Sequence, residues 1–258
     1  MNLGIAGRKA IVCASSRGLG KACARALAEA GCEVVINGRD ARRLETTTAE
    51  LSRTGVKIIP VVADVSTADG QKSLLAACPQ PDILVNNNAG PPMRDFRELT
   101  RQQMLDGVIA NMVVAIELIQ KVIDPMCERK FGRIVNITSG SVKMPLAGLD
   151  LSSGARAGLT AFLAGVARKV ADRNVTINNI LPGAFDTDRL QSTLSKTAEQ
   201  QNKSVAEVAA TRAASIPAKR FGNPDEFGAA CAFLCSAHAG YITGQNLLID
   251  GGTFNGAF

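Results

Sequence analysis

Short runs of β-branched and aliphatic residues alternate along this chain with longer segments of helical periodicity. Near-continuous apolar runs such as AIVC and IVNI are typical of parallel strands that helices cover on both faces. Strand–helix alternation implies right-handed crossovers. The pattern therefore predicts an α/β fold with a doubly wound, parallel, seven-stranded sheet and helices on both faces. The predicted strands span residues 9–13, 33–37, 57–63, 82–86, 133–138, 176–181 and 246–249.

A helix is predicted between the first two strands, because apolar residues recur there every three or four positions. Gly31 ends this helix. Residues 189–219 are polar and helical in composition, which predicts an excursion from the sheet that suits a substrate lid. With no internal repeat or linker, we expect one domain over residues 1–258. The apolar stripe of the first helix is Leu19, Ala22, Cys23, Ala26, Leu27 and Ala30.

The composition narrows the choice of partners. Hydrophobic residues make up 46% of the 258 positions and charged residues 20%, which is ordinary for a globular domain. Only 4% are aromatic and Trp is absent, which argues against stacking of single-stranded nucleic acid. The chain has no run of five basic residues, which would indicate DNA or membrane binding. It also has no 18-residue apolar stretch, which would predict a membrane span. We expect neither nucleic acid nor a membrane as partner.

The spacing of the seven cysteines is not that of a disulfide framework, which predicts that their thiols are reduced. Because the N-terminus also lacks a long apolar leader segment, we expect a cytoplasmic protein. Cys231 and Cys235 lie four residues apart on a predicted helix, a spacing that suggests a metal pair. His238 is the only histidine, so core packing is the favoured interpretation and no metal site is predicted.

A glycine-containing loop follows the first predicted strand and opens the first helix. Glycines there let the backbone approach a pyrophosphate, and the helix N-terminus supplies N–H donors and a positive dipole end. Gly-x-Gly alone is weak evidence, and a pair of turn glycines is the alternative. The position between strand and helix favours a dinucleotide site of Rossmann type. The expected cofactor-binding residues of this loop are Ser15, Ser16, Arg17, Gly18, Leu19 and Gly20.

The turn after the second strand predicts which nicotinamide cofactor binds. An NAD site normally places Asp or Glu there for the ribose 2′-hydroxyl, whereas this chain has Arg39, with Arg17 expected as its neighbour. Two guanidiniums suit a 2′-phosphate. Asp40 could pair with an arginine and weaken this preference. The net charge of +6 fits either a basic solvated surface or attraction of such a phosphate-bearing ligand. The pattern favours NADP(H) over NAD(H).

Further motifs resemble those of the classical short-chain dehydrogenase/reductases, nearest to the 3-oxoacyl-carrier-protein reductase type, over essentially the whole chain. The family's Thr-Gly-x-x-x-Gly-x-Gly is present with Cys13 and Ala14 in place of Thr and the first Gly. A methyl group at Ala14 is tolerated if its φ is negative. The resemblance implies that further cofactor contacts come from Asp64, Val65, Asn87, Asn88, Ala89, Gly90, Pro182, Gly183 and Thr187.

The catalytic positions depart from that family. Its Asn, Ser, Tyr and Lys cooperate: the Tyr donates a proton, the Lys lowers the pKa of the Tyr and binds ribose, the Ser orients the carbonyl and the Asn anchors a water relay. The resemblance places these four roles at Asn111, Ser139, Ser152 and Arg156. The only tyrosine, Tyr241, lies in a segment that resembles the family's final strand and turn, where packing is the expected role.

Three hypotheses follow for this Ser-x-x-x-Arg site. One is a reductase with a substituted proton source, such as water held by Ser152, Ser139 and Arg156. Another is an enzyme for acceptors that need no protein acid, such as protonated imines. The third is a catalytically silent NADP(H)-binding subunit or sensor. Arg156 is not expected to relay protons, because a guanidinium stays protonated at ordinary pH.

The substrate and the assembly are less closely defined. A small molecule or an acyl thioester is the expected substrate, with Arg94 or Arg189 as candidates to meet a carboxylate or a phosphopantetheine phosphate. The resemblance implies a homotetramer whose interface uses predicted helices at 102–121 and 153–171.

Overall fold

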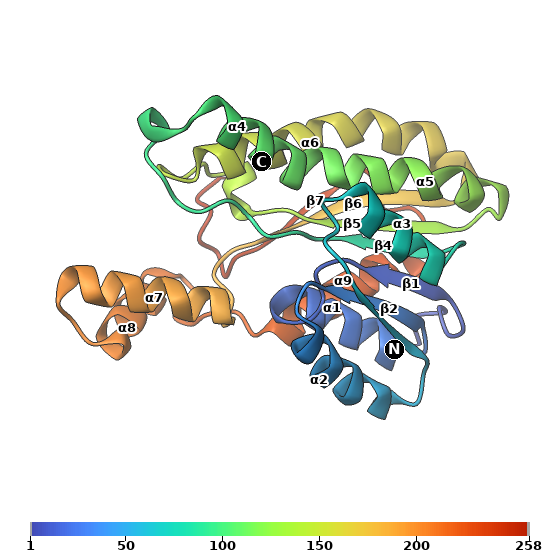
Figure 1. Cartoon of the computed structure of the whole chain (residues 1–258), viewed down its shortest axis with the longest axis horizontal. Coiled ribbons are helices and arrows are strands. Elements are labelled where there is room, and N and C mark those ends of the chain that lie inside the picture. Colours follow the sequence, from blue (N-terminus) through green and yellow to red (C-terminus); the bar gives the residue numbers. More distant parts are fainter. Residues whose placement is uncertain (1, 257–258) are drawn as a thin grey trace.

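A single parallel sheet organises the computed structural model, which describes residues 2–256 (Figure 1). Its order is β3-β2-β1-β4-β5-β6-β7, and every neighbouring pair is parallel. The predicted fold class is confirmed, and each predicted strand is present within two residues of its expected ends. The strands are β1 Lys9–Val12, β2 Glu33–Gly38, β3 Ile58–Val62, β4 Ile83–Asn86, β5 Gly132–Ile137, β6 Val175–Pro182 and β7 Asn246–Ile249.

Alternation along the strands builds two separate cores, because successive side chains point to opposite faces of a sheet. Ala10 and Val12 of β1 pack with α1, α2 and α9, whereas Ile11 packs with α3, α5 and α6 on the other face. Figure 1 shows these helices as two layers around the sheet. The helices are α1 Gly18–Glu29, α2 Ala41–Leu51, α3 Ala68–Ala77, α4 Arg101–Val108, α5 Val114–Glu128, α6 Asp150–Val170, α7 Asp188–Gln201, α8 Val205–Ser215 and α9 Pro224–Leu234.

The helix predicted at 102–121 is not one regular helix. A π-helical segment, Ile109–Val113, separates α4 from α5. This wider turn contains Asn111 and changes the direction in which the following residues face, a feature that π-helical turns often show at functional sites. The helix predicted at 153–171 lies almost wholly within α6.

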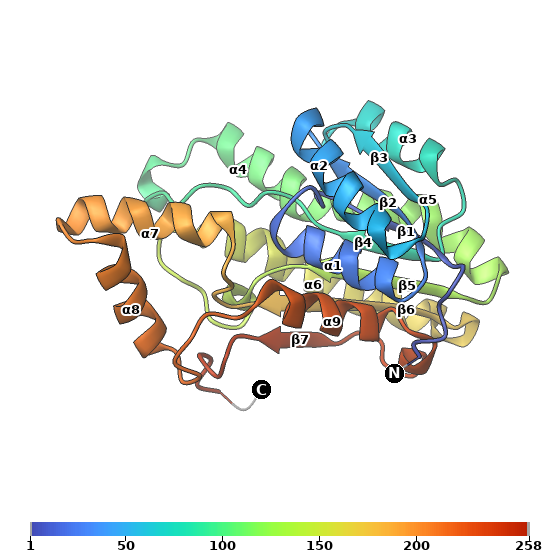
Figure 2. The ribbon, with the colours of Figure 1, turned by 90° about the horizontal axis from the view of Figure 1, so that it is seen from below.

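Helices α7 and α8 form a hairpin that projects from the body of the molecule (Figures 1 and 2). It has a small apolar core of its own, made by Leu190, Leu194, Ala198 and Val208. The predicted excursion at 189–219 is therefore present as two helices. In the part of the chain that the structure describes, no helix is both long enough and apolar enough to cross a membrane.

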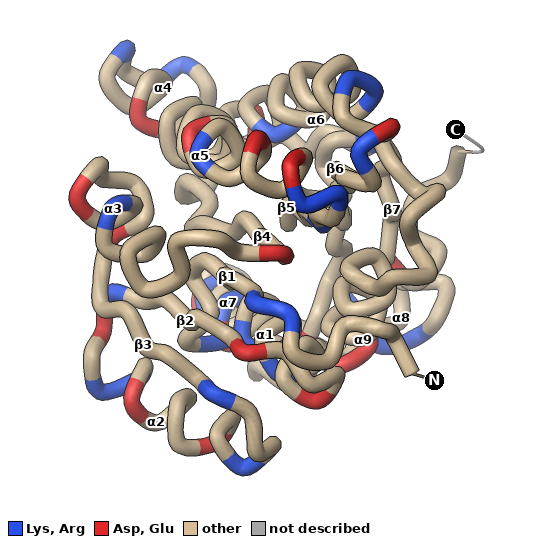
Figure 3. Tube along the Cα trace, turned by 90° about the vertical axis from the view of Figure 1, so that its right-hand side faces the viewer, with Lys and Arg blue, Asp and Glu red and all other residues tan. Residues whose placement is uncertain are grey.

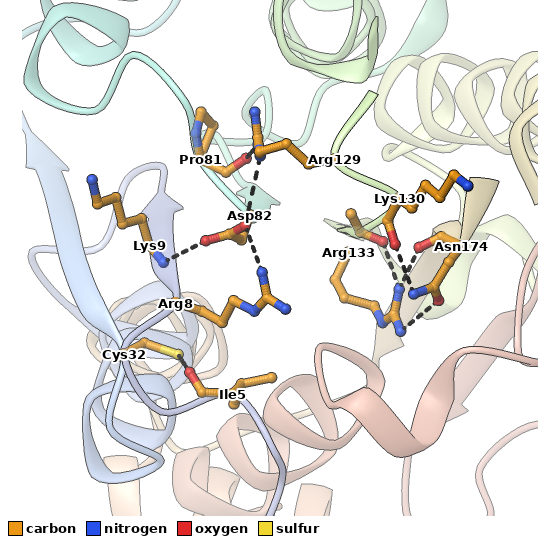
Figure 4. A network of polar contacts seen from close by, with 11 residues as sticks. Ile5, Arg8, Lys9, Cys32, Pro81, Asp82, Arg129, Lys130, Arg133 and Asn174 are labelled. Atoms are coloured by element: carbon orange, nitrogen blue, oxygen red, sulfur yellow. Dashed lines mark hydrogen bonds and ion pairs between the residues drawn. The ribbon is translucent and has the colours of Figure 1, made fainter. Parts of the chain in front are cut away.

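The amino ends of the strands are tied together by buried and half-buried charges (Figure 4). Asp82, just before β4, accepts hydrogen bonds from Arg8 Nη1 at 3.2 Å and from the Lys9 backbone at 3.0 Å. Arg133 is 1% exposed and donates to the carbonyl oxygens of Asn174 and Ser236. Every donor of a buried guanidinium needs an acceptor, so this network serves the fold and leaves the carboxyl ends of the strands for chemistry.

Candidate active site at the carboxyl edge of the sheet

The loop between β1 and α1 is held in shape by Ser15. Its hydroxyl donates to the Val12 carbonyl at 2.7 Å and accepts from the Asn37 backbone N–H at 2.9 Å. Because Ser15 is 0% exposed, its side chain joins the ends of β1 and β2 and does not line the open pocket. Ser15, which was predicted to contact the cofactor, therefore fixes the shape of the loop beside the pocket.

Gly20 permits a close approach between this loop and β4. A Cβ atom on Gly20 would lie 2.4 Å from the Ala14 oxygen and 2.9 Å from Asn87 Nδ2. Asn87 in turn donates to the Ala14 oxygen at 3.1 Å. Gly18, at φ +57°, faces Thr187 across the cleft, with 3.8 Å between its Cβ position and Thr187 Cγ2. The predicted phosphate loop, the end of β4 and the start of α7 therefore meet at one place.

Ala14 does not meet the condition under which its methyl group was expected to be tolerated. Its φ is +45°, in the left-handed region, and not negative. The Ala14 N–H donates to Asn37 Oδ1 at 3.2 Å, and its carbonyl accepts from Asn87. These two bonds hold a conformation that costs an alanine about 1–2 kcal/mol, so the site retains a turn that glycine would form more easily.

An open pocket beside the loop gathers arginines that could hold a 2′-phosphate. Arg17 and Arg43 both lie 3.6 Å from the Asp188 carboxylate, at the start of α7. The predicted Arg39 is not among the residues that line this pocket; its side chain is 72% exposed, and its Nη1 lies 3.5 Å from Oδ2 of Asp64, another predicted cofactor residue. The pocket is lined by Ser16, Arg17, Gly18, Lys21, Asp40, Arg42, Arg43, Thr46, Thr47 and Asp188.

Asp40 has another role than the one considered from the sequence. Its carboxylate accepts from the Arg43 backbone N–H at 3.1 Å and so caps the N-terminus of α2. Among the described residues it forms no ion pair with an arginine. Of the two acidic residues that line the pocket, Asp188 of α7 is therefore the one that pairs with its arginines.

Acidic and basic residues occur side by side along outer helices such as α2 and α3 (Figure 3). Attraction of a phosphate therefore depends on the particular arginines of the pocket. A dinucleotide fits these residues: the glycine loop offers the backbone approach that a pyrophosphate needs, and Arg17, Arg42 and Arg43 would hold a phosphate on the adenosine ribose.

The remaining predicted contacts line the same edge in different ways. A hydrogen bond from the Ser66 backbone, with help from Arg39, holds the pKa of Asp64 below its usual range. The Val65 side chain lies in the core, which leaves its backbone for any contact. Asn88 Nδ2 donates to Ser66 Oγ at 2.9 Å and to the Ala110 oxygen at 3.1 Å. Asp64, Asn88 and the π-helical segment are thus linked.

The loop after β6 completes this edge. The Gly183 backbone N–H donates to the Ile249 oxygen at 2.9 Å, and a Cβ on Gly183 would lie 2.7 Å from Asp250 Cα. Thr187 caps α7 by accepting from the Leu190 backbone. Pro182 ends β6, and the half-buried Gly90 and exposed Ala89 follow β4. Backbone, more than side chains, faces the cleft here.

Asn111 and Ser139 occupy fixed positions near the cleft. Asn111 of the π-helical segment is 7% exposed and donates to the Gly107 oxygen of α4 at 3.1 Å. Ser139 follows β5, and its hydroxyl accepts from the Ser141 backbone at 3.1 Å. Within residues 2–256, no hydrogen bond joins Ser139 to Ser152.

Ser152 and Arg156 form a buried pair one turn apart on α6. Arg156 Nη1 donates to Ser152 Oγ, and the two residues are 5% and 7% exposed. Burial, and to a lesser degree the positive charge of Arg189, lowers the pKa of Arg156 to about 10. The guanidinium is still protonated at pH 7, so at neutral pH the site places a positive charge against a serine hydroxyl.

A ladder of asparagines was not foreseen from the sequence. Asn86, Asn136, Asn179 and Asn246 are register partners on β4 to β7, and each amide donates to the next at 2.8–3.0 Å. The buried Asn86 Oδ1 has no partner among the described residues. It faces a cavity of about 20 Å³, also lined by Asn111 and Arg156, which is large enough for one water molecule.

Three residues outside this edge also test the sequence interpretation. The expectation that Tyr241 packs is wrong for this chain, because the residue is fully exposed at 102%. The prediction that Cys231 and Cys235 pack in the core is confirmed, since both are 0% exposed. Among the described residues, no group of His, Cys, Asp and Glu has the arrangement of a metal site.

Comparison with known proteins agrees with this geometry. A family model described as "Enoyl-(Acyl carrier protein) reductase" matches residues 13–253. Nodulation protein G of Azospirillum brasilense is 34% identical over 251 residues, 94% of this chain and 96% of that protein. The 3-oxoacyl-[acyl-carrier-protein] reductase FabG of Vibrio cholerae is 31% identical over 256 residues, 98% of this chain and 99% of that protein.

A solved structure extends the likeness to three dimensions. L-sorbose reductase from Gluconobacter frateurii, complexed with NADPH and L-sorbose, has a TM-score of 0.94 and 27% identity, and 100% of both chains is covered. The sequence matches therefore reach across the whole sheet and its carboxyl edge. The chain belongs to the short-chain dehydrogenase/reductase family of nicotinamide-dependent oxidoreductases.

Proposed function

We propose that this protein is an NADP(H)-dependent oxidoreductase that reduces a carbonyl group of 3-oxoacyl type, or an imine, with an atypical proton source. The observation that carries the proposal is the buried pair in which Arg156 donates to Ser152 Oγ. A buried guanidinium costs folding free energy unless something compensates it. Its retention beside the cofactor edge supports a chemical role for the pair.

The cofactor of this proposal is NADP(H). Support comes from the pocket beside the glycine loop, where Arg17, Arg42 and Arg43 lie together and could hold a 2′-phosphate. The related L-sorbose reductase is an NADPH complex. When bound, NADPH supplies the hydride for reduction.

The residues of α6 would then stabilise the oxygen that becomes negatively charged. Because Ser152 Oγ accepts from Arg156, its own O–H is free to donate to the substrate oxygen. The Arg156 charge acts through this bond in a site that is almost closed to water, where electrostatic stabilisation is strong. The alkoxide takes its proton from water, since Arg156 keeps its own at neutral pH.

Asn111 and Ser139 have supporting roles in this scheme. Asn111 and Arg156 line the small cavity next to the unpartnered Asn86 Oδ1. A water there would have polar partners on three sides and could replenish the proton. Ser139, at the end of β5, would orient the substrate carbonyl, as its family position implies.

A catalytically silent NADP(H)-binding protein is the second candidate. One observation favours it: the chain's single tyrosine, Tyr241, is fully exposed, so no phenol is available as a proton donor in the site. Such a protein would keep the cofactor edge and lose turnover.

One experiment separates the two. NADPH consumption by the purified protein is measured with β-keto thioesters, other ketones, aldehydes and cyclic imines. The Ser152→Tyr/Arg156→Lys double variant is run beside it. Turnover by the wild type that the double variant loses supports chemistry specific to the Ser/Arg pair. A silent wild type, with a double variant that reduces ketones, would instead support the binding protein.

The assembly and the surroundings of the enzyme complete the proposal. Exposed apolar side chains on α4 and α6, including Met104, Leu105 and Phe162, support a homotetramer built through these helices. Light scattering would give the mass of the assembly.

The α7–α8 hairpin, residues 189–219, is proposed as the substrate lid. A cytoplasmic location is proposed as well, since reduced cysteines such as these are typical of that compartment.

A further inference from the structure

The first turn of α7 faces two parts of the cofactor edge. On one side, Asp188 Oδ2 lies 3.6 Å from Nη1 of both Arg17 and Arg43, in the pocket proposed for the 2′-phosphate. On the other side, Arg189 reaches the loop after β4, where a Cβ atom on Gly90 would lie 3.0 Å from Arg189 Nη1. The α7–α8 hairpin therefore begins among the groups that the cofactor would use.

The rest of the hairpin has few polar ties to the body of the molecule. Its small apolar core is separate from the two cores of the sheet. The hydrogen bonds that residues 189–215 make outside their own helices all end within residues 184–222. Among the described residues, the two ion pairs of Asp188 are thus the only polar contacts that join the hairpin to the body.

The hairpin is connected to the body through a narrow stem. The Asp186 backbone donates to the Gly222 oxygen and the Gly222 backbone donates to the Ala184 oxygen, both at 2.9 Å. Phe185 and Gly222 form an isolated parallel bridge at this place. A stem of two short segments lets a packed unit turn without disturbing its own core. Contacts of the first turn can therefore determine where the hairpin lies.

Attraction and repulsion act on opposite sides of the first turn. The point 3.0 Å from Arg189 Nη1, at the Cβ position of Gly90, also lies 3.2 Å from Arg156 Nη2. Over the part of the chain that the structure describes, no carboxylate forms an ion pair with Arg189. Because two like charges repel at this separation, the attraction that keeps the turn in place comes from Asp188.

We propose that the two Asp188 ion pairs form a latch, which the 2′-phosphate of NADP(H) opens by taking Arg17 and Arg43. A phosphate monoester carries up to two negative charges and binds guanidiniums through paired hydrogen bonds. The Asp188 carboxylate carries one charge and, at 3.6 Å, lies beyond hydrogen-bond distance from either arginine. The phosphate therefore wins this competition and frees the hairpin. The inference rests on the proposed function for the phosphate pocket and for the hairpin as a lid.

Hydrogen exchange of the backbone amides of residues 188–215, followed by mass spectrometry, tests the latch without turnover. The protein is saturated with 2′,5′-ADP or with 5′-AMP, which differ only in the 2′-phosphate and lack the nicotinamide half. We expect 2′,5′-ADP to speed this exchange about 2- to 30-fold, the range for loss of two exposed ion pairs, and 5′-AMP to leave it unchanged. Equal exchange with the two ligands, or slower exchange with 2′,5′-ADP, would overturn the proposal.

Three variants locate the effect. Asp188→Asn should show the faster exchange without ligand, and 2′,5′-ADP should then add nothing. Arg43→Gln removes one partner and leaves α7 unaltered, so exchange should rise about 1.5- to 5-fold. Arg42→Gln is the matched control, because it removes the same charge from the same pocket and helix, while Arg42 forms no ion pair within residues 2–256. Equal effects of the two arginine changes would reject the latch.

Calorimetry of 2′,5′-ADP separates a failure of the latch from a failure of the proposed function. Binding of 2′,5′-ADP with unchanged exchange in the hairpin rejects the latch and leaves the proposed reductase standing. Faster exchange in a protein that reduces no substrate of the panel rejects the reductase and leaves the latch standing. No binding of 2′,5′-ADP would overturn the phosphate pocket and the latch together.

Discussion

The Asp188 carboxylate occupies a place that a 2′-phosphate would compete for, so replacing it should strengthen NADPH binding. Asp188 lies 3.6 Å from both Arg17 and Arg43. All three side chains are more than 40% exposed, so each ion pair is screened by water and contributes about 0.2–1 kcal/mol. If the phosphate displaces both, Asp188→Asn saves about 0.4–2 kcal/mol, which is an affinity gain of about 2- to 30-fold.

The assay is a titration followed by NADPH fluorescence at low and at high salt. Affinity for NADH, which has no 2′-phosphate, should change little in Asp188→Asn. The gain for NADPH should shrink as salt screens the exposed charges. Asp225→Asn removes a comparable surface pair with Arg25 and serves as the control. Unchanged or weaker NADPH binding by Asp188→Asn would refute the assignment of this pocket to the phosphate.

Three further predictions concern the loop, the sheet and the charge on α6. Ala14→Gly should raise the free energy of unfolding by about 0.5–1 kcal/mol, because relief of the left-handed strain exceeds the entropy cost of glycine; a lower denaturation midpoint would contradict this. Asn136→Ala should lower the free energy of unfolding by about 2–4 kcal/mol in chemical denaturation, because the side chains of Asn86 and Asn179 lose their hydrogen-bond partner. A loss of less than about 1 kcal/mol would mean that water replaces the amide. Turnover should fall as pH rises through about 10, where Arg156 loses its charge; a flat profile to pH 11 would remove that charge from the mechanism.

The fold could be predicted because its signals are local. Apolar runs without a polar face predict strands of a covered parallel sheet, and the structure has each strand, although the edge strands β3 and β7 are only partly buried. The break at Ile109–Val113 could not be predicted, because one wider turn scarcely changes the spacing of apolar residues. The asparagine ladder depends on strand register, which brings residues 50 and 43 positions apart into contact.

Site residues were predictable where backbone geometry determines them. Gly18 and Gly20 follow from the strand–loop–helix order, whereas the partner of a long side chain does not. Arg39 was expected to hold the 2′-phosphate and pairs with Asp64 in the structure, so its role as a phosphate ligand stays a prediction. The meeting of Arg156 and Arg189 required the path of α7, which no local pattern gives.

The central claim is that Ser152, held by Arg156, assists the chemical step. The most direct test measures NADPH oxidation by the wild type and by Ser152→Ala on the best substrate of the panel, with NADPH affinity measured in parallel. We predict a fall in kcat of about 10²-fold or more, the usual scale for a lost hydrogen-bond donor to a developing oxyanion, with NADPH affinity unchanged. Equal kcat in the two proteins would contradict the claim.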